Sequence, residues 1–517
     1  MISEYWDAVA VGSQEYLFIF FTCQKKRPIK IPLPASNQTL IDADNTCVQW
    51  GLSEHALFQP VVMVSRGSVM YIINVVLLGA SGFSRGHGGA ITSISVHPTT
   101  PNLFCTTSRD NTTRVYDLVL EVLQPTETPN GKRIRTSKTK IYNAHWPPST
   151  KPSFAGAAHG LRLVRHEAEG SGIGRCIVVL MGGRSGGHHA AVLGAAFHPI
   201  FPILATCGMD RCVKIWPIRP VNPFDIKTED KPLFSSSRIH KASVLSVNWY
   251  NCLLLMYTGI NAWMVRLADD ILLTHSAPAH MRRYPNDSND RETYLEPGEL
   301  ILWRWLGVDR FFPPKWEDLK ASDLLFRGCS SDYQESSSFK LVAIHAFPSV
   351  ETQYITPKLS VFKSPTHDPI ILFTYPNSTS FDMINVCHLS PKRVPPFPLD
   401  LETPETPERQ TTPTPSSTRA AAPEGVHTDV EDEREVLDEL DGTPPVQVIN
   451  KTPVINGREE VPPPGLEGWT IDIRDHDNGF KVWDDNKKLM NVAMGVDGQF
   501  IVGVGSGGSL WVWRPMP

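Results

Sequence analysis

The chain has 517 residues, of which 41% are hydrophobic and 20% charged, and its formal net charge is -5. This composition allows a large core, and the negative balance argues against a dedicated nucleic-acid binder, whose domain would be basic. The nine cysteines form no C-x-x-C pair, which favours a reduced intracellular protein over a disulfide or zinc framework. No stretch is long and apolar enough to predict a bilayer span.

Short strand-like runs fill the first eighty residues. They are apolar or alternating in character and are separated by polar turns: "EYWDAVAVG", "EYLFIFF", "TCVQW" and "PVVMVSRGSVMYII". Such runs are typical of β-strands in sheets that bury one face or both. The chain starts almost inside a strand, so we expect a ring built from these sheets to lack its closing strand.

Two segments then repeat the same pattern. They are "GHGGAITSISVHPTTPNLFCTTSRDNTTRVYDL" at 86–118 and "GHHAAVLGAAFHPIFPILATCGMDRCVKIWPI" at 187–218. Each holds three short strand-like runs with tight turns, and the connection supplies a fourth. Four-stranded antiparallel units with this signature are the blades of WD-repeat propellers, so the sequence predicts an all-β WD-repeat β-propeller.

The polar residues of each repeat predict a buried hydrogen-bonded network rather than a catalytic site. A turn histidine, a strand threonine, a turn aspartate and a strand tryptophan can satisfy one another. In the second repeat these are His188 or His189, Thr206, Asp210 and Trp216. In the first they are His87, Thr106 and Asp110, with Tyr116 in place of tryptophan, which predicts a weaker network.

Fainter copies and two inserts complete the chain. Strand patterns recur at 238–249, 298–305, 368–386 and 498–515, whereas "CLLLMYTGINAWM" fits no blade. Residues 121–178, with the basic run "GKRIRTSKTK", are predicted to be a surface loop insert. Residues 390–467 are rich in Pro, Thr and acidic residues and predict disorder. We therefore expect blades over 1–389, a disordered linker over 390–467 and the final blade over 468–517.

The order of the motifs resembles one family. "G-H-G-x-A-I", "H-P-x-x-P-N-L", "S-x-D", "C-G-M-D-x-x-x-K-[IL]-W" and "I-H-[KR]" occur in the order and spacing of the ESC/EED proteins, the WD-repeat subunits of Polycomb repressive complex 2. The resemblance implies a seven-bladed, non-catalytic nuclear scaffold acting in transcriptional repression through histone methylation. It would bind an E(z)-type SET-domain methyltransferase on one face, join other Polycomb subunits, and read trimethyl-lysine on the histone H3 tail at the opposite, top face.

The residues of that top face carry over only in part. Of the family's aromatic cage, Tyr354 alone matches, because Asn45 and Thr46 stand where a second aromatic is expected. Arg66, Arg109 and Met209 follow the second strands of their blades. Since all such turns of a propeller share one face, we expect them to line the site of the histone peptide.

Two alternatives stay open. A WD-repeat adaptor of another assembly, such as a ubiquitin-ligase substrate receptor, would not explain the ordered motifs. An enzyme would need a catalytic motif, and the Gly-rich "MGGRSGGHHA" lacks the Gly-Lys-Ser/Thr ending of a phosphate loop. We therefore expect no enzymatic activity, no cofactor or metal, no membrane partner and no direct sequence-specific binding of nucleic acid.

Overall fold

The computed structural model describes most of the predicted strands. The described residues are 4–13, 15–34, 46–53, 59–122, 170–183, 186–218, 226–250, 253–258, 261–266, 270–283, 292–313, 316, 334–347, 358–362, 370–374, 383–388, 454–455, 458–459, 468–472, 489–495, 500–505 and 510–513. Within them, the helical element is the short α1 (Val308–Phe311), so the predicted all-β class is confirmed. No helix in these ranges is long and apolar enough to cross a membrane.

The first three blades come from the N-terminal part of the chain. Blade 1 has three strands: β1 (Ala8–Gly12), β2 (Tyr16–Phe21) and β3 (Ile29–Pro32). Blade 2 has four: β4 (Val48–Ser53), β5 (Gln59–Arg66), β6 (Val69–Asn74) and β7 (Gly79–Ser84). Blade 3 has β8 (Ile91–Val96), β9 (Leu103–Ser108), β10 (Thr113–Glu121) and β11 (Gly170–Leu180), and β11 also pairs with β7 and with β15 (Lys227–Glu229).

Blades 4 to 7 follow in chain order. Blade 4 has β12 (Val192–Phe197), β13 (Ile203–Gly208), β14 (Val213–Pro217) and β16 (Phe234–Ser236). Blade 5 has β17 (Val244–Tyr250), β20 (Ile271–Ser276), β23 (Glu299–Trp305) and β24 (Phe339–Ala346). Blade 6 has β25 (Lys358–Phe362), β26 (Ile370–Thr374), β27 (Met383–His388) and β30 (Gly468–Asp472). Blade 7 has β31 (Leu489–Met494), β32 (Ile501–Gly505) and β33 (Leu510–Trp513).

Three hairpins stand outside this order. They are β18 (Leu253–Thr258) with β19 (Asn261–Arg266), β21 (Ala279–Arg283) with β22 (Glu292–Glu296), and β28 (Val454–Ile455) with β29 (Arg458–Glu459). The described residues of the stretch "CLLLMYTGINAWM", which fitted no blade in the sequence, lie in the first of them. The second interrupts the turn between β20 and β23.

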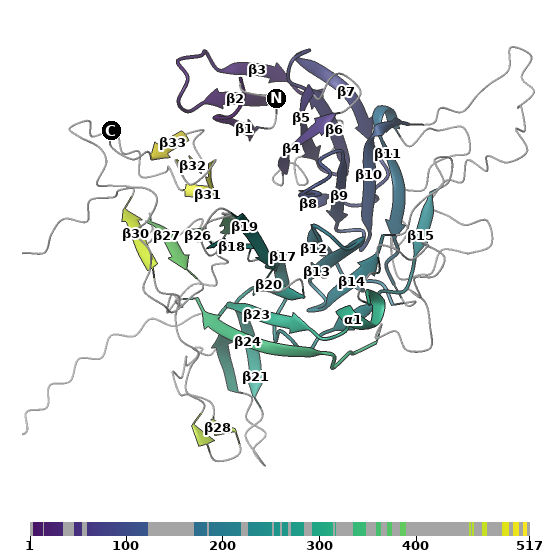
Figure 1. Cartoon of the computed structure of the whole chain (residues 1–517), viewed down its shortest axis with the longest axis vertical. Helices are drawn as coiled ribbons and strands as arrows, with labels where there is room; N and C mark the ends of the chain where they lie inside the picture. Colours follow the sequence, from purple (N-terminus) through teal and green to yellow (C-terminus); the bar gives the residue numbers. More distant parts are fainter. Residues whose placement is uncertain are drawn as a thin grey trace, which may run out of the picture.

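The blades succeed one another around a ring, as the strand labels of Figure 1 show. Among the described residues there are seven such blades, the first and last with three strands and the others with four, and the pairing of β7 with β11 joins blades 2 and 3 into one nine-stranded sheet. Each neighbouring pair from blades 1 and 2 to blades 6 and 7 shares a buried apolar cluster. Contiguous burial between successive sheets is the usual basis of a propeller, so the predicted propeller is confirmed.

Two predicted boundaries need correction. The range 121–178, assigned to a loop insert, contains most of β11, the fourth strand of blade 3. Glycines at 170, 172 and 174 open this strand and hide its apolar pattern, which emerges only from Cys176 onward. Likewise, β30 pairs with β27 and completes blade 6, so the final blade does not begin at residue 468.

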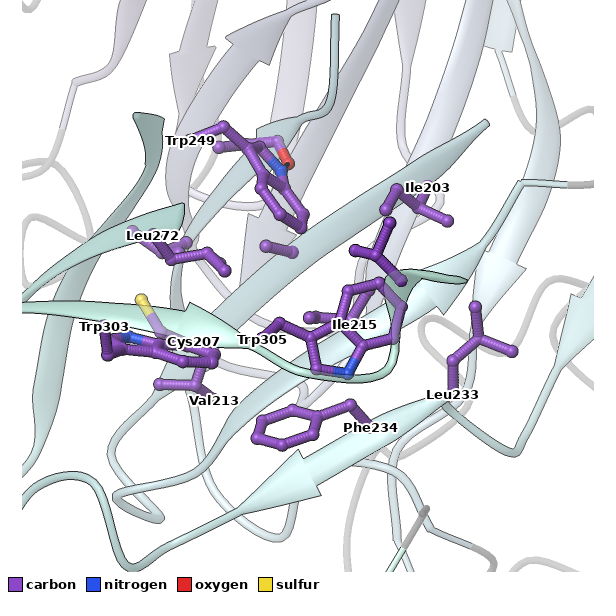
Figure 2. Close-up of a cluster of buried hydrophobic side chains, with 14 of the residues drawn as sticks. Ile203, Cys207, Val213, Ile215, Leu233, Phe234, Trp249, Leu272, Trp303 and Trp305 are labelled. Atoms are coloured by element: carbon purple, nitrogen blue, oxygen red, sulfur yellow. Dashed lines mark hydrogen bonds between the residues drawn. The ribbon is translucent and has the colours of Figure 1, made fainter. Parts of the chain in front are cut away.

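The largest buried cluster lies between blades 4 and 5. Trp249, Trp303 and Trp305 are fully buried there, together with Phe234. Figure 2 shows these aromatic rings gathered with Ile215 and other aliphatic side chains of the two blades. Each buried aromatic or aliphatic side chain contributes about 1.5–3 kcal/mol, so this cluster holds the two blades rigidly together.

Candidate functional site

The second repeat joins four polar side chains at one end of blade 4. Trp216 Nε1 donates to Thr206 Oγ1 at 2.8 Å, and Thr206 Oγ1 lies 2.8 Å from His188 Nε2. His188 Nδ1 lies 3.0 Å from Asp210 Oδ2. An imidazole with its proton on Nδ1 donates to the carboxylate and accepts from the threonine hydroxyl, so every group is satisfied. His188 therefore takes the histidine position, while His189 is exposed and its backbone N–H donates to Asp210.

Burial fixes the protonation of this network. It lowers the pKa of His188, although the negative charge of Asp210 acts to raise it. The imidazole is therefore neutral near pH 7. Burial alone would raise the pKa of Asp210, but His188 and the His189 backbone N–H hold it well below its usual range. A neutral imidazole beside an ionised carboxylate suits a structural network.

The first repeat builds a related network in blade 3. His87 Nε2 lies 2.7 Å from Thr106 Oγ1, and His87 Nδ1 lies 3.0 Å from Asp110 Oδ2. Thr112 adds a hydroxyl 2.6 Å from Asp110 Oδ1 and 3.2 Å from His87 Nδ1. Burial would raise the pKa of Asp110, but His87, Arg114 and Thr112 outweigh it and hold the pKa at about 2.

Tyr116 occupies the position that tryptophan has in the second repeat. Its ring stacks on Phe104 with the centroids 5.0 Å apart, and its hydroxyl accepts from Ser84 Oγ at 3.4 Å. The sequence predicted a weaker network from this replacement. Thr112, which the sequence analysis did not consider, reinforces the opposite end of that network.

Blade 5 holds a third network that the sequence analysis missed. His240 Nε2 lies 2.7 Å from Thr274 Oγ1, which also accepts from Trp303 Nε1 at 3.1 Å. No aspartate completes it: Pro278 stands four residues after the threonine, where the second repeat has Asp210. His240 Nδ1 is buried without a hydrogen-bond partner among the described residues. Burial and the neighbouring His275 lower the pKa of His240 to about 3.

A spacing signal could have revealed this third histidine. His87, His188 and His240 each lie four residues before the first residue of their blade's inner strand, β8, β12 and β17. The hairpin β21–β22 separates Thr274 from Trp303, whereas ten residues separate Thr206 from Trp216. This insertion conceals the later half of the repeat.

Comparison with known families agrees with these networks. The family model described as WD domain, G-beta repeat matches residues 81–117 and 174–217, which cover blade 3 and most of blade 4. The chain therefore has a propeller fold in which two segments match WD repeats. The second matched segment includes most of β11, which confirms that this strand belongs to the repeat pattern.

Several solved structures are similar to the chain. A chain of the Chaetomium thermophilum polycomb repressive complex 2 matches with 17% identity and a TM-score of 0.45, over 74% of this chain and 63% of that chain. A chain from another structure of that complex, bound to GSK126, matches with 16% identity and a TM-score of 0.43, over 74% of this chain and 66% of that chain. A chain of the mitotic checkpoint complex has 13% identity and a TM-score of 0.44, over 99% and 87%. The propeller thus spans just under two thirds of the Chaetomium chains.

The residues predicted for the histone-binding face lie at one end of the ring. Arg66 is the last residue of β5, and Arg109 and Met209 occupy the turns that follow β9 and β13. These turns meet the starts of β8 and β12, because Ile91 N donates to Gly67 O and Met209 N to Ala191 O. We call this end the top face. Tyr354, the predicted cage residue, lies outside the described residues.

Exposed apolar side chains gather at the opposite end, which we call the bottom face. Eight large apolar side chains are exposed in the described part of the chain, and only Met209 lies at the top. The others are at the bottom ends of blades 1, 2 and 5 or in the lower half of β24: Trp6, Val76, Leu77, Leu78, Leu306, Leu341 and Val342. Val76, Leu77 and Leu78 adjoin in one turn, and a contiguous exposed apolar surface is typical of an interaction site.

The turn between β6 and β7 is the most exposed part of this bottom face. Asn74 Oδ1 accepts from the backbone N–H groups of Val76 and Leu77 at 3.0 and 2.9 Å, which fixes the turn. Leu77 is 70% exposed, and Leu78 has a φ of 54°, a left-handed conformation that disfavours a leucine. A strained and exposed apolar turn points to function rather than stability.

Proposed function

We propose that this chain is a non-catalytic scaffold subunit of a Polycomb-type histone H3 lysine methyltransferase complex in the nucleus. The ordered motifs that resemble the ESC/EED family support this assignment. The observation that carries it is the separation of two faces: apolar side chains at the bottom, and at the top the turns of Arg66, Arg109 and Met209. A scaffold needs one surface for the enzyme and another for the substrate chromatin.

The bottom face suits a segment of the SET-domain methyltransferase. Its exposed residues are distributed around the ring, from Trp6 in blade 1 through Leu77 in blade 2 to Leu306 in blade 5. An amphipathic helix or extended segment laid across this end would cover them with its own apolar side chains. Full burial of one leucine contributes about 1.5–3 kcal/mol, so a few such contacts support a stable complex.

The top face is proposed to read trimethyl-lysine on the histone H3 tail. Tyr354 would supply an aromatic ring for the quaternary ammonium, which is attracted to the face of such a ring. Arg66, Arg109 and Met209 would line the path of the peptide. Because the two faces are at opposite ends of the ring, the enzyme and the histone tail could bind together.

Co-purification with an E(z)-type methyltransferase tests the scaffold role. The full chain and the enzyme, with and without the other Polycomb subunits, would be co-expressed and purified through a tag on the enzyme. We expect a stoichiometric complex in which this chain raises methylation of histone H3 by the enzyme. Folded chain that does not co-purify would contradict the proposal and favour the WD-repeat adaptor.

Peptide binding tests the reader role separately. Unmodified and trimethylated H3 peptides would be titrated into the chain and into Tyr354→Ala. We expect tighter binding of the trimethylated peptide, and loss of that preference in the variant. Equal binding of both peptides by the unaltered chain would leave the scaffold role intact and contradict the reader role.

A further inference from the structure

Cationic side chains are concentrated on the top face. The turns after the second strands, and the segments leading into the inner strands, contribute one or more in each of blades 2 to 5: Arg66, Arg85, Arg109, Arg211, Arg238 and Lys241. The chain as a whole has a net charge of -5, so this cationic surface is local. Local potentials of this kind direct the association of charged partners.

Surface carboxylates pair with the two blade 5 cations of this set. Lys241 Nζ lies 2.6 Å from Glu296 Oε1, and Arg238 Nε lies 3.9 Å from Glu335 Oε2. Across the described residues, Arg66, Arg109 and Arg211 form no ion pair with a carboxylate. Arg109 and Arg211 are exposed, and Arg66 is partly exposed with Nη1 donating to the carbonyl of Pro34.

The nearby aspartates do not cancel the charge of these arginines. Asp110 and Asp210 adjoin Arg109 and Arg211 in sequence, but both carboxylates accept hydrogen bonds inside their blades. Each also has a buried cation close by, and these cations help to lower the pKa values of the two aspartates: Arg114 beside Asp110 and Lys214 beside Asp210. The surface arginines therefore keep an outward positive charge.

Hydrogen bonds connect the three arginine turns into one continuous row. The Arg66–Gly67 turn accepts from the backbone N–H of Ile91, and Arg109 N donates to Ala90 O one residue earlier. Thr92 Oγ1 then donates to Val192 O, whose neighbour Ala191 accepts from Met209 N. Because these hydrogen bonds join adjacent blades, the arginine turns of blades 2, 3 and 4 follow one another along the top face.

We propose that this row of arginines binds the phosphate backbone of a nucleic acid. Guanidinium groups match phosphate oxygens in geometry and charge, and a row of them can contact a polymer that carries one charge at every step. The histone peptide of the proposed reader role would cross the same turns, so the peptide and the nucleic acid would compete for this face. Phosphate contacts carry no base sequence, so the binding is non-specific. The proposal does not depend on the Polycomb assignment.

If the arginines bind phosphates, the affinity for nucleic acid must fall with rising salt concentration by a calculable amount. Each phosphate that a cation neutralises releases counterions, and contributes about -0.9 to the slope of log K against log salt for duplex DNA or about -0.7 for a single strand. Three arginines therefore give slopes of about -3 and -2. Fluorescence anisotropy with a labelled DNA duplex and a labelled single-stranded RNA, each at several salt concentrations, measures both slopes and distinguishes the two sources of phosphate.

Matched variants locate the site. The triple variant Arg66→Gln, Arg109→Gln and Arg211→Gln is expected to lose most of the affinity at low salt and nearly all of the slope. The control carries Lys25→Gln, Lys26→Gln and Arg27→Gln, which removes the same charge from the β2–β3 turn at the bottom face. It is expected to retain the slope. Thermal unfolding of both variants checks that the propeller remains folded.

Three results would overturn the proposal. The first is an unaltered chain whose affinity for both nucleic acids does not change with salt. The second is a folded top-face variant whose slope matches that of the unaltered chain, or a control variant that loses as much. The third is a polyglutamate peptide that binds as tightly as the nucleic acids, which would assign the face to an acidic protein segment instead.

Discussion

The two ends of this propeller differ in chemistry although the same strands build both. At the bottom, the β6–β7 turn exposes Leu77, and the segment after β23 exposes Leu306. At the top, hydrogen-bonded networks hold the turns, and arginines project from them. The repeat thus constrains the top turns through buried His–Asp pairs, whereas the bottom turns are free to carry apolar residues. The same fold can in this way serve two different partners.

The largest expected effect comes from the core that supports both faces. Trp303→Ala should lower the free energy of unfolding by about 3–5 kcal/mol, because the indole is fully buried and donates to Thr274. Urea unfolding measures this, and both faces should lose binding together. Trp6→Ala, at an exposed bottom position, should change stability by less than about 0.5 kcal/mol. Similar small effects for both variants would contradict the packing of blades 4 and 5.

A change in one network should affect the top face alone. Asp210→Ala removes the acceptor for His188 Nδ1 and for the backbone N–H groups of His189 and Cys212. Unsatisfied buried donors should lower the free energy of unfolding by about 2–3 kcal/mol and weaken ligand binding at the top. Capture of the methyltransferase at the bottom should persist. Asp309→Ala, which is exposed, is the control, and equal losses in the two variants would contradict this account.

The incomplete network of blade 5 should be sensitive to pH. The pKa of His240 is about 3 when folded, below the ordinary value of 6.5, so the unfolded chain binds the proton more tightly. Stability is therefore full above about pH 6.5 and falls as pH decreases toward 3, by up to about 1.4 kcal/mol per pH unit from this residue. Unfolding of His240→Phe at several pH values should show a shallower decline. Parallel curves for the two proteins would contradict the burial of a neutral His240.

The smallest effect is expected for Leu78→Gly, which should raise stability but weaken binding at the bottom face. Leu78 has a left-handed backbone conformation, which costs a leucine about 1–2 kcal/mol. Leu78→Gly removes this cost, and the conformational entropy that glycine loses on folding offsets the gain only in part. The variant should be more stable by about 0.5 kcal/mol in thermal unfolding. It should also capture less methyltransferase, because an exposed apolar contact is gone. Lower stability together with unchanged capture would mean that the turn has no binding role.

The repeats made much of the fold predictable. The spacing from turn histidine to threonine, aspartate and aromatic in the two clear copies was sufficient to name His87, Asp110, Asp210 and Trp216, which the structure places in two networks. It left His188 and His189 as alternatives, and the structure places His188 in the network. Arg66, Arg109 and Met209 could be placed at one end from the alternation of strands and turns alone.

The strand β11, the His240 network and the bottom face could not be predicted from the repeat pattern. The opening glycines of β11 concealed a strand, and the β21–β22 hairpin concealed the network of His240. The bottom face could not be predicted either, because exposure is not visible in a sequence. Leu77 and Leu78 have the composition of core residues, and only the three-dimensional fold reveals them at the surface.

The central claim is that the bottom face, and not the top, binds the SET-domain methyltransferase. The most direct measurement compares the affinity of that enzyme for Leu77→Ser and for Met209→Ser. The two residues are 70% and 54% exposed and lie at opposite ends of the ring. The account predicts a loss of at least about tenfold for Leu77→Ser, since burial of a leucine contributes about 1.5–3 kcal/mol, and no more than a twofold change for Met209→Ser. Equal affinities, or a loss confined to Met209→Ser, would contradict it.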